Sequence, residues 1–321
     1  MKEKITIFGK NITDQDKTKV RDFLQSKKDM NRQKIEDEYE KTDEEIKFIQ
    51  VLSGYISQEL EKLGIQEVPE IKPDEFHFLP QDMFKKKYRK ETNGNGVYDA
   101  HEQVVYISRD RMKNRLYKFQ TMMHDAVHLV AFKKMHKEES GGIIVYRSGY
   151  VSRNVNLLED QDILRHEHFR GLDEAIVDKF TFDLVNNNWE NLKEEFNISN
   201  DEVDRSKVYY HEPFIAILDE IIKRLAEHKG EKEDKIWENF KRGLFTGEML
   251  HLRDVEKTFG PGSLRVLGAL NSKNTRQRMF HSTEVKRIKD FFQAKSQEER
   301  DELAAQILNK QELKKYQNRQ I

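Results

Sequence analysis

Hydrophobic residues recur at helical spacing near the start of the chain. Thr42 and Glu45 form a capping box, the side-chain pair that opens many helices, and Gly64 is placed to end the helix. The apolar positions between them are Ile46, Phe48, Ile49, Leu52, Ile56, Leu60 and Leu63. The pattern predicts a helical N-terminal region over residues 1–70, which we interpret as a scaffold beside the main domain in preference to a lid or a partner-binding element.

Short strands replace this pattern after Pro69 and Pro73, because proline breaks helices. The segments that follow are rich in β-branched and aromatic residues, and the Asn-Gly repeat of residues 93–96 is a turn signal. We expect strands at residues 75–79, 97–98, 104–107, 143–146 and 149–151. The second and third of these should pair as a hairpin, and so should the last two.

Helical spacing returns on either side of the second strand pair. Residues 116–135 carry apolar side chains on one side, and a further helix is predicted to start at Gly171 with Asp173 as its N-cap. From about residue 208 to the end the pattern is helical again. We expect this last part to be interrupted at Gly247, at residues 260–262 and at Asn274.

The order of these elements, helices followed by a small β region and then by helices again, predicts an α+β fold. We expect three regions along the chain. Residues 1–70 form the N-terminal helical region, residues 71–230 form a central domain with the strands and the two helices that flank them, and residues 231–321 form a C-terminal helical region.

Composition narrows the classes of function. The 57 Lys and Arg residues and the 58 Asp and Glu residues cancel to a net charge of −1, so no nucleic-acid partner is expected. There is no cysteine, which excludes disulfides and thiolate metal ligands. The N-terminus lacks the apolar run of a signal peptide, and no stretch approaches the roughly 20 apolar residues of a membrane span. We therefore expect a soluble, cytoplasmic protein.

The run His124-Asp125-Ala-Val-His128 carries the candidate chemistry. Residues four apart on a helix lie on one face, one turn from each other, so both imidazoles can reach a single metal ion. A catalytic zinc takes three protein ligands and a water molecule. Asp125, directly after the first histidine, is placed to act as the general base that takes the proton of that water.

A second motif downstream repeats the four-residue spacing. Glu174 can supply the third ligand, and Asp178 can accept a hydrogen bond from the other ring nitrogen of a ligand histidine. A chain with eleven histidines will place some of them four apart by chance, so His124 and His128 alone are compatible with two solvated histidines. The matching downstream pair favours a metal site.

These motifs together resemble a known family. A strand, a His-x-x-x-His helix, a hairpin and the run Gly-Leu-Asp-Glu-Ala-x-x-Asp-x-x-Thr from Gly171 to Thr181 resemble the gluzincin branch of zinc metallopeptidases, whose signature is HExxH followed by ExxxD. The likeness covers residues 74–230 in layout. It implies a zincin-like fold, Zn²⁺ as cofactor and a peptide or protein substrate. It also implies that His124, His128 and Glu174 bind the zinc, that Asp125 is the general base, and that Asp178 accepts a hydrogen bond from a ligand histidine.

The resemblance implies two further features. In that family an edge strand just before the active helix pairs with the extended substrate, and residues 104–107 occupy that place. A donor from a later helix stabilises the oxyanion, for which Tyr209, Tyr210 and His211 are the candidates.

Asp125 is the departure from the family pattern. Asp is one methylene shorter than Glu, so its carboxylate falls about 1 Å short of the Glu position, and small misplacements cost a large factor in rate. Three outcomes are open: a working peptidase with a shifted backbone, a slow enzyme or one with a different scissile bond, and a site that binds zinc without turnover.

Two other classes of function remain. His124 and Asp125 could be the adjacent pair of an HD-type metal-dependent phosphohydrolase, with His101 and either Asp162 or Asp178 as distant ligands. The β region is out of place in that all-helical fold, and His128 and Glu174 are then unexplained. Alternatively the chain is a charged helical interaction protein with a relic or structural metal site. The remaining charged features are interpreted as solvated surface. His166 and His168 could instead line a substrate cleft, and the basic run of residues 85–90 could contact phosphate.

Overall fold

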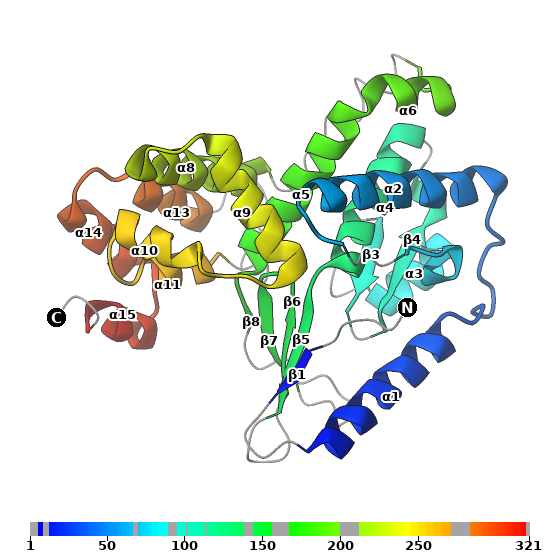
Figure 1. Ribbon diagram of the computed structural model, residues 1–321, viewed down its shortest axis with the longest axis horizontal. Coiled ribbons are helices and arrows are strands. Elements are labelled where there is room, and N and C mark those ends of the chain that lie inside the picture. Colours follow the sequence, from blue (N-terminus) through cyan, green and yellow to red (C-terminus); the bar gives the residue numbers. More distant parts are fainter. Residues whose placement is uncertain are drawn as a thin grey trace. The chain divides into compact units, whose positions relative to one another are not determined.

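The computed structural model describes residues 6–8, 13–66, 70–88, 95–100, 102–112, 114–137, 144–155, 167–199, 212–270 and 283–318 (Figure 1). The chain divides into two compact units, each made of two stretches. The first unit contains Met1–Ala131 and Lys179–Tyr209, and the second contains Phe132–Asp178 and Tyr210–Ile321. Helices and two small sheets make up the described residues, which confirms the α+β class. The three regions expected along the sequence stay a prediction.

The capping box near the start of the first unit forms as predicted. In α2 (Asp43–Lys62), the Glu45 backbone N–H donates to the Thr42 hydroxyl at 3.2 Å, and the Thr42 N–H donates to the Glu45 carboxylate at 3.0 Å. Gly64, with φ +75°, follows the end of the helix. This unit also contains β1 (Thr6–Phe8), α1 (Asp14–Asn31), η1 (Pro73–Glu75), α3 (Gln81–Tyr88), η2 (Arg109–Arg111) and α6 (Trp189–Glu195).

The sheet of the first unit has three strands in the order β2 (Phe76–Leu79), β4 (Val104–Ser108) and β3 (Gly96–Asp99). β4 runs parallel to β2 and antiparallel to β3, so the predicted hairpin is confirmed. However, the expectation that residues 104–107 form an edge strand is wrong. Both sides of β4 are paired within the sheet, so β2 and β3 are the edge strands. Of these two, β3 contacts the helix that carries His124 and His128.

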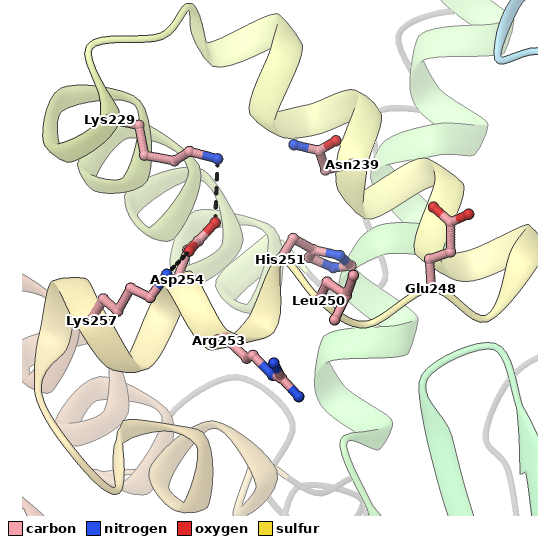
Figure 2. A pocket seen from close by; sticks show the side chains of 8 residues that line it. All are labelled: Lys229, Asn239, Glu248, Leu250, His251, Arg253, Asp254 and Lys257. Atoms are coloured by element: carbon pink, nitrogen blue, oxygen red, sulfur yellow. Dashed lines mark hydrogen bonds and ion pairs between the residues drawn. The ribbon is translucent and has the colours of Figure 1, made fainter.

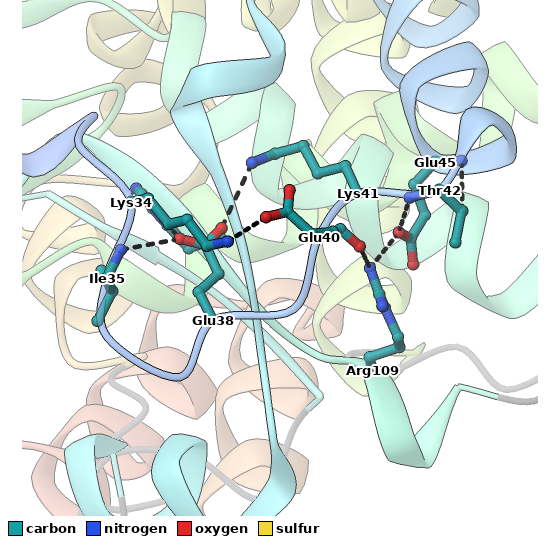
Figure 3. A network of polar contacts seen from close by, with 9 residues as sticks. Lys34, Ile35, Glu38, Glu40, Lys41, Thr42, Glu45 and Arg109 are labelled. Carbon is teal, nitrogen blue, oxygen red and sulfur yellow. Dashed lines mark hydrogen bonds and ion pairs between the residues drawn. The ribbon is translucent and has the colours of Figure 1, made fainter.

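Residues 33–41, which we call the strap, follow α1, and Figure 3 shows the polar contacts of Lys34, Glu38 and Lys41 in this segment. The Tyr39 backbone N–H donates to the Phe78 carbonyl at 2.9 Å, and the Glu38 carboxylate lies 2.8 Å from Nδ1 of His77. Burial raises the pKa of Glu38, but the hydrogen bond and charge of His77 outweigh it and lower that pKa to about 2. The strap is therefore fixed to β2 by both its backbone and a buried charged group.

Helix α4 (Arg115–Val130) packs against α2, and their contact is aromatic. The Phe48 ring lies 5.5 Å from Phe119 and 4.5 Å from Phe196, both in edge-on geometry. The predicted helix 116–135 is wrong at its C-terminal end, because Lys133–Lys137 forms strand β5. No glycine or proline marks the helix end at Val130, and pairing of β5 with residues 144–148 takes the following residues out of the helix.

In the second unit, β5, β6 (Ile144–Ser148), β7 (Val151–Val155) and β8 (Glu167–His168) pair in sequence order, each antiparallel to the next. The predicted pairing of the fourth and fifth strand segments is confirmed, although Gly149 and Tyr150 form the turn between the strands. Helix α5 (Arg170–Asn187) begins in this unit and continues into the first, since the boundary falls after Asp178 within the helix.

The remaining helices of the second unit are α8 (Glu212–Lys229), α9 (Glu233–Thr246), α10 (Leu252–Phe259), α11 (Ser263–Gly268), α13 (Thr283–Gln293), α14 (Gln297–Ile307) and α15 (Lys310–Gln317). The predicted breaks at Gly247 and at residues 260–262 are confirmed, while Asn274 lies outside the described residues. Phe259, Phe291 and Phe292 form an aromatic cluster in the core of this unit. Among the described residues, no helix has the length and apolar character needed to cross a membrane.

Candidate metal centre

Helix α4 presents His124 and His128 because its sequence is amphipathic and well capped. The Asn114 side chain accepts the Tyr117 backbone N–H at 2.8 Å and so satisfies a donor that the first turn leaves open. The apolar residues of the helix are buried, whereas the two histidines are only partly buried. Their imidazoles therefore remain accessible to a ligand, one turn apart on the same face.

The distance between the two imidazoles fits a shared metal ion. Nε2 of His124 lies 3.2 Å from Nε2 of His128. Two nitrogen ligands on a tetrahedral zinc, each at about 2.1 Å from the ion, are about 3.4 Å apart. The same separation also allows an N–H···N hydrogen bond between one neutral ring and the other.

Glu174 completes the group. It lies on α5, and one donor atom each of His124, His128 and Glu174 fall within 4.8 Å of one another. The structure thus brings together the three residues that the sequence singled out as ligands, and the group could hold a metal ion. Two imidazoles and a carboxylate suit zinc and several other divalent first-row ions, so the donor set does not select one metal.

Arg170, one turn before Glu174, places a positive charge beside this carboxylate. Its guanidinium lies 3.4 Å from Oε1 of Glu174 and 3.4 Å from Oε1 of Glu167. A carboxylate has two oxygens, so Glu174 can keep this ion pair on one of them while the other binds a cation.

Asp125, the expected general base, is turned toward β3. The Tyr98 backbone N–H donates to Oδ1 of Asp125 at 3.0 Å, and the side chain is 4% exposed. Among the described residues, the group of donor atoms that could share an ion contains His124, His128 and Glu174 but not Asp125. Consecutive residues of a helix point about 100° apart, which separates this carboxylate from the imidazole face.

A second aspartate beside a ligand has an equivalent contact, which sequence reasoning missed. Asp173, predicted as an N-cap, instead lies inside the first turn of α5, because the helix begins at Arg170. Its Oδ1 accepts the Tyr150 backbone N–H at 2.7 Å. A Cβ atom added to Gly149 would overlap the same oxygen. In the sequence this contact is signalled by the glycine before Tyr150, a residue that the strand prediction for 149–151 includes.

The other site residues expected from sequence are less informative. Asp178 lies one turn after Glu174 on α5, and its hydrogen bond to a ligand histidine stays a prediction. His168 is exposed on β8, as expected for a solvated side chain. The remaining candidates lie outside the described residues: His101, Asp162, His166, Tyr209, Tyr210 and His211.

The second unit contains a cavity of about 370 Å³ beside α10 (Figure 2). It is lined by Lys229, Asn239, Glu248, Leu250, His251, Arg253, Asp254 and Lys257. Asp254 lies 3.2 Å from Lys229 and 3.0 Å from Lys257, so one carboxylate pairs with two lysines. Burial lowers the pKa of His251 to about 4, and the ring is therefore neutral at pH 7.

Tyr150 connects this cavity to the core of the unit. Its hydroxyl lies 2.6 Å from Nε2 of His251 and 3.0 Å from the Phe240 carbonyl oxygen. A tyrosine hydroxyl has one proton to donate, and a carbonyl can only accept. The arrangement that satisfies all three groups has Tyr150 donating to Phe240 and accepting from the Nε2–H of His251.

Comparisons with known proteins do not assign this chain to a group. No family model matches it, and no similar chain was found among curated proteins or solved structures.

Proposed function

We propose that the protein is a zinc-dependent hydrolase that cleaves peptide bonds. The observation that carries this proposal is the meeting of His124, His128 and Glu174, whose donor atoms fall within 4.8 Å of one another. Two of these residues come from one helix and the third from another, at the spacing of the gluzincin pattern. Three protein ligands leave a fourth position of a tetrahedral ion open, which is typical of catalytic sites and not of structural ones.

Each residue of the candidate metal centre has a separate role in this proposal. His124 and His128 would hold zinc as neutral imidazoles, and Glu174 would supply the negative charge. When bound, zinc lowers the pKa of a water molecule toward neutrality and so supplies hydroxide for attack on a carbonyl. Arg170 holds the Glu174 carboxylate in position through their ion pair. Asp125 is left out as general base, because its carboxylate is bonded to β3.

A peptide as substrate is proposed from the resemblance to the gluzincin pattern, and an aromatic ring of β3 lies beside one of the candidate ligands. β3 is an edge strand of its sheet, and the ring of Tyr98 on this strand stacks with the ring of His128 at a centroid distance of 6.2 Å and an interplanar angle of 7°. The edge of β3 is not open to pairing with an extended peptide at Tyr98, because the outward N–H of this residue already bonds to Asp125.

The phosphohydrolase alternative receives less support. It requires Asp125 as a ligand next to His124, whereas the Asp125 carboxylate bonds to the Tyr98 N–H and is absent from the donor group of the described residues. The interaction-protein alternative requires a metal site without turnover, and it differs from our proposal only in the outcome of an activity assay.

Metal content by mass spectrometry of tag-free protein tests the proposal first. We expect about one zinc per chain in the wild type and loss of zinc in His128→Ala and Glu174→Ala, with helical circular dichroism retained in both. His168→Ala is the matched control, because it removes an exposed histidine from β8 and should leave the zinc content unchanged. Wild-type protein that takes up no zinc when zinc is supplied would refute the proposal.

Peptide cleavage tests the second half of the proposal. Zinc-loaded wild type is expected to hydrolyse members of a random peptide library, and His128→Ala is expected to be inactive. A zinc-loaded protein that cleaves no peptide would leave the interaction protein with a metal site as the better account.

A further inference from the structure

We propose that Asp125 is a positioning residue, which fixes β3 to the helix that carries both histidine ligands, and that it is not the general base. The significance of this role for catalysis rests on the function proposed above. The contact itself does not, because Asp125, Tyr98, Gly96 and the two histidines all belong to the first unit.

The first argument is the hydrogen bonding of β3. The Ser108 N–H donates to the Asn95 carbonyl at 2.7 Å, so the backbone groups of Asn95 point toward β4. Because these directions alternate along an antiparallel strand, the backbone groups of Gly96 and Tyr98 point away from β4. The Tyr98 N–H would thus be left at the sheet edge, and Asp125 provides its acceptor at 3.0 Å.

The second argument is space. A Cβ atom added to Gly96 would overlap Oδ2 of Asp125 and would lie 2.6 Å from Cγ2 of Thr121. One carboxylate oxygen therefore bonds to Tyr98 while the other packs against Gly96. No room remains for the additional methylene of a glutamate in this direction. The close approach of strand and helix accounts for Asp at the position where the gluzincin pattern has Glu.

The third argument is continuity with the ligands. β3 contacts α4 at successive turns: Asn95 Nδ2 donates to the Tyr117 hydroxyl at 2.9 Å, Gly96 lies against Thr121, and Tyr98 meets both Asp125 and the ring of His128. Without the hydrogen bond between the Tyr98 N–H and Asp125, β3 would lose one of these contacts with α4. The ring that stacks on His128 would then lose its fixed position.

The second unit contains an equivalent contact between an aspartate and a tyrosine backbone N–H. Asp173, adjacent to Glu174, accepts the Tyr150 N–H at 2.7 Å and packs against Gly149. In both units an aspartate next to a candidate ligand bonds to a tyrosine backbone N–H near a glycine. The repetition favours a role in placing the ligand helices over a role in proton transfer.

Two measurements on the full chain test the proposal: hydrogen exchange at the Tyr98 amide by NMR, and the dissociation constant for zinc alone. Asp125→Asn keeps an oxygen acceptor of the same shape, whereas Asp125→Ala removes it. We expect exchange at Tyr98 to accelerate about tenfold or more in Asp125→Ala and to stay near the wild-type rate in Asp125→Asn. Zinc affinity should fall in the alanine variant and be restored in the asparagine variant.

Asp82→Ala is the control, because it removes an exposed aspartate from α3 in the same unit. It should change neither measurement. Asp125→Glu provides a second arm in which the acid is retained but the fit is lost. We expect it to accelerate exchange at Tyr98 and to weaken zinc binding, without a gain in hydrolysis.

Several results would overturn the proposal. One is wild-type exchange at Tyr98 in Asp125→Ala, which would show that no such bond exists. Another is loss of peptide hydrolysis in Asp125→Asn while zinc affinity and Tyr98 exchange stay at wild-type values, which would assign Asp125 to proton transfer. If the wild type binds no zinc, the proposed function fails, but exchange at Tyr98 still decides whether Asp125 holds β3.

Discussion

Asp125 and Asp173 form the same bond in different surroundings. The Asp125 carboxylate accepts the N–H of Tyr98, a half-buried residue of an edge strand. The Asp173 carboxylate accepts the N–H of Tyr150, which is fully buried in a turn where Gly149 has φ +54°. A carboxylate next to a candidate metal ligand can therefore bond to a backbone N–H, at a strand edge or at a turn.

The side chains of the two tyrosines account for the different consequences we expect. The Tyr98 ring stacks on His128, a candidate ligand, whereas the Tyr150 hydroxyl bonds within the core to Phe240 and His251. Disruption at Asp125 should therefore affect metal binding most. Disruption at Asp173 should affect the stability of its unit most.

The largest expected effect is that of Asp173→Ala. Removing this acceptor leaves a fully buried N–H without a partner, and we expect a loss of about 3 kcal/mol in the free energy of unfolding, against about 2 kcal/mol for Asp125→Ala. Urea denaturation at pH 7 measures both values, with Asp82→Ala as the control. A larger loss for Asp125→Ala would reverse the comparison.

The next effect is a pH dependence confined to the second unit. Burial lowers the pKa of His251 to about 4, whereas the unfolded chain binds this proton near pH 6.5. Between these values the unfolded state binds more protons, so acidification favours unfolding, and we expect a loss of about 2 kcal/mol from pH 7 to pH 5.

His251→Gln should remove this part of the pH dependence, and NMR titration of the wild-type ring should give a midpoint near 4. A ring that titrates near 6.5 would contradict this prediction, because it would mean that water in the cavity beside α10 solvates His251 fully.

The smallest effect distinguishes the two glycines. A methyl group added at Gly149 or at Gly96 would meet the neighbouring aspartate in each case. Only Gly149 also has a positive φ, which disfavours side chains, so Gly149→Ala should cost about 1 kcal/mol more than Gly96→Ala. Equal losses in urea denaturation would show that the aspartate contact alone sets the cost.

Local patterns in the sequence predicted much of this structure. The capping box at Thr42 and the hairpin of β3 and β4 depend on neighbouring residues, and both form as expected. The spacing of His124, His128 and Glu174 also predicted which donors would meet. The capping box, the hairpin and the meeting of His124 with His128 need only helix or strand geometry and a short stretch of chain. Glu174 lies on another helix, and its place in the group was predicted from the likeness of its motif to the gluzincin pattern.

Features that depend on distant partners could not be predicted in this way. The central position of β4 results from parallel pairing with β2, which lies well before it in the chain. The end of α4 at Val130 depends on the pairing of β5 with β6. The direction of the Asp125 side chain depends on how closely Gly96 approaches the helix, and the spacing of the histidines contains no information about that contact.

The strap has a consequence for how the protein behaves among its own copies. An edge strand with open backbone groups is a template on which another molecule can add a strand and start aggregation. Tyr39 bonds to Phe78 of β2, and Asp125 bonds to Tyr98 of β3, so each outer strand of this sheet has an intramolecular partner. A chain shortened to begin after the strap would expose β2, and self-association would then compete with folding.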